Sequence, residues 1–146
     1  MREAVERILL TVWVGGMWTV GYIVAPVLFQ MLSRIQAGTV AGQLFSIMSY
    51  LGLVSGGLLL SSLILDSGKQ LFRQWRGPVL IVMLLVICVG QFVLQPQMVA
   101  LREAGLQGQH LHAFMRLHGF SQVLFLIASL GGLALVMYGV RAKQLT

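Results

Sequence analysis

The chain has 146 residues, of which 58% are hydrophobic and only 10% are charged, whereas soluble domains carry roughly 25% charged residues. Its formal charge of +6 comes without a basic helix or an aromatic stacking surface outside the apolar segments, so a nucleic acid is not an expected partner. The single cysteine, Cys88, excludes an internal disulfide and a Cys-x-x-Cys metal or redox motif.

Four segments without Asp, Glu, Lys or Arg span residues 8–33, 35–65, 77–101 and 117–140. An α-helix needs about 20 apolar residues to cross a hydrocarbon core of roughly 30 Å, and each segment exceeds that length. The sequence therefore predicts an all-α membrane protein, a four-transmembrane-helix bundle with helices at about residues 6–33, 38–65, 77–104 and 113–141. Because the connections are short, we expect residues 1–146 to form a single transmembrane domain in the lipid bilayer.

The first and third predicted helices each contain a proline, Pro26 and Pro96. A proline removes an amide donor and frees a carbonyl one turn earlier, and in lipid that carbonyl needs a partner from a neighbouring helix or water. These prolines either bend their helices locally or splay the outer half of the bundle around a cavity. In the first helix, we expect Gly15 and Gly16 to allow close approach of a neighbouring helix.

The distribution of Lys and Arg predicts the orientation of the bundle. The N-terminal tail, the second connection and the C-terminal tail together contain seven such residues: Arg2, Arg7, Lys69, Arg73, Arg76, Arg141 and Lys143. The other two connections contain three: Arg34, Arg102 and Arg116. The positive-inside rule then places both the N and C termini in the cytoplasm. We therefore expect a multi-pass protein of the bacterial inner (cytoplasmic) membrane.

Neutral polar side chains collect toward the predicted outer ends of the helices. Ionisable side chains within a membrane are functional candidates by default, which makes His118 the strongest one. Gln91 and Gln95 are four residues apart and are expected to share a helix face. The candidate ligand-binding residues are His118, Gln95, Gln91, Gln43, Ser121 and Gln122. The same residues can also be explained as a hydrogen-bond network that only holds the helices together.

Metal and haem sites have weaker support in the sequence. His110 and His112 lie in the third connection, residues 101–116, where we expect a short interfacial helix. Their spacing does not place both on one helix face. Four methionines lie in the outer half, and thioethers suit copper(I), but no Met-x-Met or His-x-x-x-His spacing supports such a site. A haem usually needs an axial histidine, and one histidine within the membrane does not supply a pair. No cofactor is predicted, with haem and copper left open as alternatives.

Catalytic constellations are absent from the sequence. It contains no Ser-His-Asp set, no paired carboxylates within the apolar segments and no phosphate-binding glycine loop. We therefore do not expect an enzyme.

Short motifs in all four predicted helices resemble one family. They are Trp13-Val-Gly-Gly-Met-Trp18 continuing to Pro26-Val-Leu-Phe29, Gly42-Gln-Leu-Phe45, Leu94-Gln-Pro-Gln-Met98 and Arg116-Leu-His-Gly-Phe-Ser121. In this order they resemble the transmembrane protein 205-like family, whose bacterial members carry a domain of unknown function, DUF4149. The Arg-x-His-Gly-x-Ser element is the most specific of them.

The resemblance implies little about activity, because the bacterial members have no established one. The eukaryotic relative is implicated in resistance to platinum drugs, which implies export or trafficking. Where eukaryotic members have Glu before the proline, this chain has Gln95, so a charge-based metal or proton role loses its carboxylate. The resemblance adds Arg116 to the candidate ligand-binding residues and Gly119 to the structural ones.

Two hypotheses follow for an integral membrane protein of unknown function. In the first, an outer-leaflet polar pocket around His118 binds or transports a small molecule or a soft metal ion. In the second, the chain is a structural or assembly partner of a larger membrane complex, or a homo-oligomer. Its contact surface would then be an exposed face formed by Gly52 and Gly56.

Overall fold

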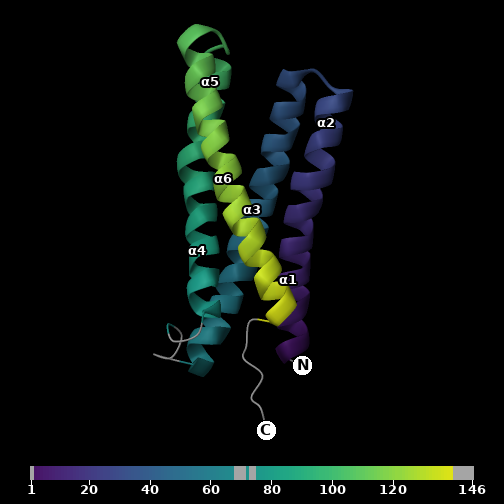
Figure 1. Ribbon diagram of the computed structural model, residues 1–146, viewed down its shortest axis with the longest axis vertical. Coiled ribbons are helices and arrows are strands. Elements are labelled where there is room, and N and C mark those ends of the chain that lie inside the picture. The colour runs from purple at the N-terminus through teal and green to yellow at the C-terminus, as the bar shows by residue number, and fades with distance from the viewer. Residues whose placement is uncertain (1, 68–71, 73–74, 140–146) are drawn as a thin grey trace.

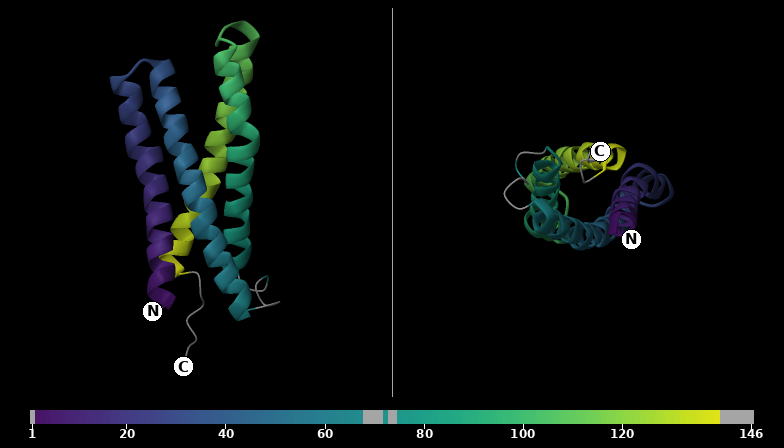
Figure 2. Two further views of the ribbon diagram at one scale, coloured as in Figure 1. Left: turned by 180° about the vertical axis from the view of Figure 1, so that it is seen from behind. Right: turned by 90° about the horizontal axis from the view of Figure 1, so that it is seen from below.

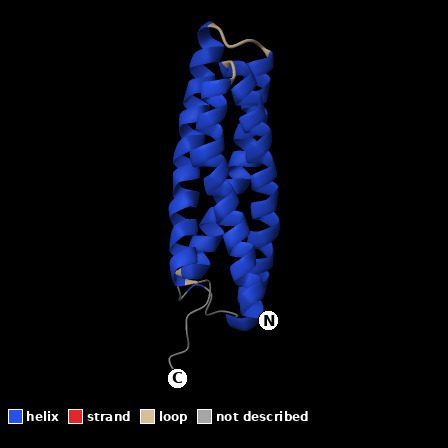
Figure 3. Ribbon diagram, turned by 90° about the vertical axis from the view of Figure 1, so that its right-hand side faces the viewer, coloured by secondary structure: helices blue, strands red, loops and turns tan. Residues whose placement is uncertain are grey.

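The computed structural model describes residues 2–67, 72 and 75–139, which are almost entirely helical and contain no strand (Figure 3). Four helices are long and apolar enough to cross a membrane: Glu3–Met31, Arg34–Leu65, Arg76–Glu103 and Gly108–Tyr138. The predicted all-α membrane protein with four transmembrane helices is therefore confirmed. Residues 140 and 141 of the predicted fourth helix lie outside the described residues, as do Lys69, Arg73 and Lys143 of the orientation argument.

The first and third membrane helices each change winding near their middle. The first comprises α1 (Arg2–Trp18), the π-helical segment η1 (Thr19–Val24) and α2 (Ala25–Met31). The third comprises α4 (Arg76–Val89), η3 (Gly90–Leu94), again π-helical, and α5 (Gln95–Glu103). The second and fourth are the single helices α3 (Arg34–Ser67) and α6 (Gly108–Tyr138).

Each π-helical segment lies directly before one of the two membrane prolines. Pro26 and Pro96 follow the first residues of α2 and α5, and both lack the N–H that an α-helix would use. Just before each proline, a backbone hydrogen bond spans five residues instead of the four of an α-helix. The Ala25 N–H donates to the Val20 carbonyl, and the Gln95 N–H donates to the Gly90 carbonyl. The wider turn lets each helix continue past its proline.

The helices form two hairpins that diverge along the bundle (Figures 1 and 2). The α2–α3 turn at Leu32 and Ser33 and the α5–α6 turn at residues 104–107 lie at one end of the bundle, which we call the turn end. The N-terminus and the last described turn of α6 lie at the opposite end, the terminal end. In the terminal half, α1 and α4 each pack on both α3 and α6. In the turn half, α2 packs on α3 and α5 packs on α6.

The third connection is shorter than the sequence suggested. The segment expected to contain a separate interfacial helix within residues 101–116 divides between the end of α5, a tight turn and the first turns of α6. Gly105 and Gly108 make this turn possible because both have positive φ angles, +89° and +52°. His110 and His112 are consequently exposed residues of α6 and not residues of a loop.

The hydrophobic core lies in the terminal half. Among the described residues, Trp13 is the largest fully buried side chain and is only 1% exposed. The core cluster consists of Leu10, Trp13, Val14, Met17, Leu59, Leu63, Leu80, Met83, Ala128 and Leu135. Gly52 and Gly56 make room for the indole, since a Cβ on Gly56 would lie 3.0 Å from the Trp13 ring and 2.7 Å from Leu84. Small residues on α3 thus allow close packing of four helices around one large side chain.

Burial of these two glycines corrects one prediction. The sequence suggested Gly52 and Gly56 as an exposed contact face, but both are buried inside the bundle against Trp13. Gly16 also lies at a helix contact, because a Cβ there would approach the sulfur of Met48 to 2.9 Å. Gly15 is exposed, and a Cβ on Gly15 or Gly119 would meet nothing within 4 Å.

Polar contacts join neighbouring helices at the terminal end. The Arg76 guanidinium donates to the carbonyl of Tyr138 at 3.3 Å and lies over the Trp75 ring. It therefore satisfies one of the carbonyls that the end of α6 leaves free. On the neighbouring pair of helices, the Ser62 hydroxyl of α3 donates to the Glu6 carboxylate of α1 at 2.7 Å. These contacts reinforce the packed half of the bundle.

Candidate functional site

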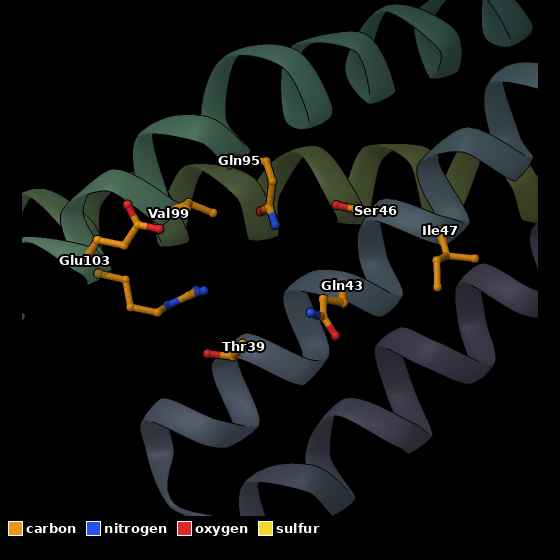
Figure 4. Close-up of a pocket in the computed structure, with 8 residues that line it drawn as sticks. Thr39, Gln43, Ser46, Ile47, Gln95, Val99 and Glu103 are labelled. Atoms are coloured by element: carbon orange, nitrogen blue, oxygen red, sulfur yellow. The ribbon is translucent and has the colours of Figure 1, made fainter.

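A polar groove lies between α3 and α5 in the turn half (Figure 4). Its volume is about 590 Å³, within the range of roughly 300–1,000 Å³ of small-molecule sites. It is lined by Thr39, Gln43, Ser46 and Ile47 of α3 and by Gln95, Val99, Arg102 and Glu103 of α5. Its two walls belong to different hairpins, which diverge toward the turn end (Figure 1).

Helical spacing explains how each helix contributes its side of the groove. The α3 residues follow the pattern i, i+4, i+7 and i+8 beginning at Thr39, and the α5 residues follow the same pattern beginning at Gln95. Residues at this spacing form one face of an α-helix. Arg102 and Glu103 belong to the last turn of α5, near the turn end. Gln95 and Ser46 lie deeper along the bundle than Glu103 (Figure 4).

A contact between Gln95 and Gly42 joins the two walls of the groove. The Gln95 side-chain amide donates to the Gly42 carbonyl at 3.3 Å. A Cβ on Gly42 would lie 3.1 Å from the same nitrogen, so a larger residue would displace Gln95. Glycine at position 42 therefore allows α3 and α5 to meet through one amide side chain.

Arg102 carries a half-buried positive charge beside the groove. Its guanidinium lies 5.5 Å from the centre of the Phe114 ring and faces the backbone of α3 near Gly38 and Gly42. Within residues 2–67, 72 and 75–139, no carboxylate or carbonyl pairs with this guanidinium, and Glu103 is likewise without an ion pair. The groove thus presents one cation and one anion that are both available to a ligand.

The predicted polar cluster is divided between two places. Gln43 and Gln95 line the groove. His118 lies on α6 and does not line the groove. Its ring stacks on Phe114 with 5.9 Å between the ring centres. Its Nε2 lies 3.3 Å from the side-chain nitrogen of Gln122, which is exposed.

The remaining predicted site residues also lie outside the groove. Ser121 contacts the sulfur of Met98 at 4.0 Å, which joins α6 to α5. Gln91 is half-buried within η3, and Arg116 is exposed on α6. The groove therefore lies on the facing surfaces of α3 and α5, whereas the sequence predicted a candidate site centred on His118 of α6.

The candidates named from the sequence omitted six of the eight groove residues: Thr39, Ser46, Ile47, Val99, Arg102 and Glu103. Arg102 served only as evidence of orientation, and Glu103 received no role. A usable signal was present, because Arg102 and Glu103 continue the face that begins at Gln95. That signal identifies a face but not its partner helix.

The residues of the groove favour polar organic ligands. They supply amides, hydroxyls, one guanidinium and one carboxylate, together with the apolar side chains of Ile47 and Val99. In the described part of the chain, no group of three or more His, Cys, Asp or Glu side chains is arranged to hold a metal ion. Hydrogen bonds and charge pairing are accordingly the interactions that this site offers a ligand.

Four apolar helices long enough to cross a membrane, with a polar groove between two of them, define a multi-pass membrane protein. A family model described as a domain of unknown function, DUF4149, matches residues 8–107, and the chain belongs to this family. It is 30% identical over 143 residues to an uncharacterized protein of Aquifex aeolicus (strain VF5), an alignment that covers 94% of this chain and 98% of that protein. No solved structure matches the chain.

Proposed function

We propose that this protein is a single-domain component of the bacterial inner membrane that binds a small polar molecule in the groove between α3 and α5. The groove itself carries the proposal, because it combines a suitable volume with polar side chains from two separate hairpins. A ligand that binds both hairpins would influence how far they diverge. A transport step requires such a relative movement of the two hairpins.

The orientation proposed here has both termini in the cytoplasm. It is supported by the excess of Lys and Arg in the N-terminal tail, the second connection and the C-terminal tail. With this orientation, the turn end and the groove face the outer leaflet. A ligand would then reach Gln43 and Gln95 from the periplasmic side.

Kinship to the transmembrane protein 205-like family is part of the proposal. It is supported by the motif from Arg116 to Ser121 and by the Gln95–Pro96 pair at the groove. Five residues outside the groove also remain candidate ligand-binding residues. Four of them lie on α6 and one lies in the third membrane helix: His118, Ser121, Gln122 and Arg116, and Gln91.

Native mass spectrometry of the protein purified from its own membranes tests ligand binding. We expect the wild-type protein to retain a cell-derived molecule that adds a defined mass. Replacing both groove amides, Gln43→Leu with Gln95→Leu, removes their hydrogen bonds and should eliminate that added mass.

A matched pair of amides outside the groove provides the control. Gln36 and Gln97 are exposed in the same half of the molecule, and their side chains bond locally to Ser33 and to the carbonyl of Val93. The double variant Gln36→Leu with Gln97→Leu should keep the bound molecule. Equal retention by both double variants, or no added mass on the wild-type protein, would overturn the proposal.

A further inference from the structure

We infer that the groove holds the phosphoethanolamine headgroup of a membrane phospholipid, taken laterally from the leaflet at the turn end. This inference rests on the proposed function and names the class of its ligand. Three independent features support it: the unpaired guanidinium of Arg102, the neighbouring carboxylate of Glu103 and the depth at which each groove residue lies.

Arg102 has the properties of a phosphate-binding residue. Its guanidinium is half-buried and held against the Phe114 ring, with no carboxylate partner among the described residues. A guanidinium presents donors in a planar fork that matches two phosphate oxygens. A lipid phosphate at the mouth of the groove would therefore supply the charge-assisted hydrogen bonds that this side chain lacks.

Glu103 makes the groove suited to a zwitterion. It lines the same groove as Arg102, so the net charge of the side chains that line the groove is zero. An ethanolamine ammonium can donate hydrogen bonds to this carboxylate, whereas a choline headgroup has no N–H to donate. A headgroup with a phosphate but no ammonium would leave the carboxylate repelling the anion. The pair therefore favours ethanolamine over choline and glycerol headgroups.

The depth of the groove residues agrees with a lipid lying along the bundle. The third membrane helix has 28 residues and is therefore about 42 Å long, close to the roughly 40–45 Å of a bilayer with its headgroup regions. Arg102 and Glu103 are its last residues and fall in the headgroup layer. The Gln95 backbone lies about 12 Å deeper along the helix than that of Glu103, but the Arg102 guanidinium and the Gln95 amide both reach toward Gly42 of α3. With a phosphate on Arg102, the Gln95 amide and the Ser46 hydroxyl can therefore donate to the acyl ester carbonyls just below it.

Lipid titration followed by native mass spectrometry tests this assignment. The delipidated protein is titrated separately with dioleoyl phosphatidylethanolamine, phosphatidylcholine and phosphatidylglycerol, which share the same acyl chains. We expect the wild-type protein to bind phosphatidylethanolamine about tenfold or more tightly than either other lipid, the factor expected for one charged hydrogen bond. Water-soluble phosphoethanolamine is a fourth arm, and we expect it to bind more weakly than the lipid because it lacks the ester groups.

Two variants separate the roles of the charges. Arg102→Gln should weaken phosphatidylethanolamine binding by about tenfold or more. Glu103→Gln should retain lipid binding but lose the preference for ethanolamine over choline. Arg34→Gln is the matched control, because Arg34 is an exposed arginine at the same end and does not line the groove. Circular dichroism and gel filtration of each variant verify that the bundle remains folded.

The outcomes distinguish this inference from the proposed function. If the wild-type protein shows no lipid preference but keeps a different molecule that depends on Gln43 and Gln95, the headgroup assignment is wrong and the proposed function stands. If Arg102→Gln and Arg34→Gln weaken lipid binding equally, the assignment is also wrong. If neither lipid nor any other molecule depends on the groove residues, both proposals fail.

Discussion

The terminal and turn halves of the molecule differ in what fills the space between the helices. In the terminal half, side chains from α1, α3, α4 and α6 surround Trp13 in one continuous core. In the turn half, α3 and α5 face each other across a groove of about 590 Å³ whose walls combine polar and charged residues with apolar surface. The same four spans therefore build a packed base and, where the two hairpins diverge (Figure 1), a top that contains the groove.

The difference shows how a bundle with few charges can present a polar site. In lipid, helices associate through close packing, and the glycines of α3 supply it around Trp13. The π-helical segments η1 and η3 and their prolines lie between this packed region and the turn end. Firm packing on one side of these segments allows the hairpins to separate on the other without loss of the bundle.

The largest expected effect comes from removing the centre of the packed half. Trp13→Ala deletes a side chain that is 1% exposed and leaves a cavity among four helices. We expect the free energy of unfolding to fall by about 3–5 kcal/mol. Detergent-titrated unfolding in mixed micelles, followed by circular dichroism, measures the change.

An aromatic residue of the turn half provides the comparison for Trp13. Phe29 of α2 is 47% exposed, so Phe29→Ala should change the free energy of unfolding by no more than about 0.5 kcal/mol. Similar losses in the two variants would show that the halves are equally packed, against this account.

A pair of adjacent glycines sharpens the comparison within α3. A Cβ on Gly56 would meet Leu84 at 2.7 Å, while one on Gly57 would meet nothing within 4 Å. Gly56→Leu should therefore lower the free energy of unfolding by about 1–3 kcal/mol through overpacking. Gly57→Leu should leave it nearly unchanged in the same unfolding assay, and an equal effect of both substitutions would contradict the packing described here.

The smallest expected effect concerns a single hydrogen bond between the hairpins. The hydroxyl groups of Tyr22 in η1 and Ser129 in α6 lie 3.0 Å apart. Tyr22→Phe should lower the free energy of unfolding by about 0.6 kcal/mol, the average for such bonds in a membrane. Tyr50→Phe is the control, because the ring of Tyr50 packs on Phe92 but its hydroxyl bonds to no described residue. A loss as large for Tyr50→Phe would mean that the Tyr22 bond contributes nothing specific.

The sequence predicted the spans well because charge and hydropathy constrain each helix separately. It predicted the third connection poorly. Residues 108–116 are polar enough to be taken for a loop, but they form the first turns of α6. It also placed Gln91 beside Gln95 by α-helical spacing. The π-helical segment η3 shifts the helix phase between them, and only Gln95 lines the groove.

Contacts between helices were harder to predict from one sequence. Gly52 and Gly56 have the same spacing whether they face a partner protein or Trp13, and only the rotation of α3 decides between the two. The position of Gln43 opposite Arg102 and Glu103 across the groove likewise depends on how the two hairpins face each other. A single sequence carries no direct record of that relative rotation.

Cysteine labelling with a membrane-impermeant maleimide tests the packed base and open top together with the proposed orientation, in which the top faces outward. In a Cys88→Ala background, Thr39→Cys places a thiol in the groove and Ser55→Cys places one at a site that is 2% exposed in the packed half. Thr39→Cys should react in intact cells, and Ser55→Cys should stay unlabelled even after the cells are permeabilised. Labelling of Thr39→Cys only after permeabilisation, or equal labelling of both thiols, would contradict the account.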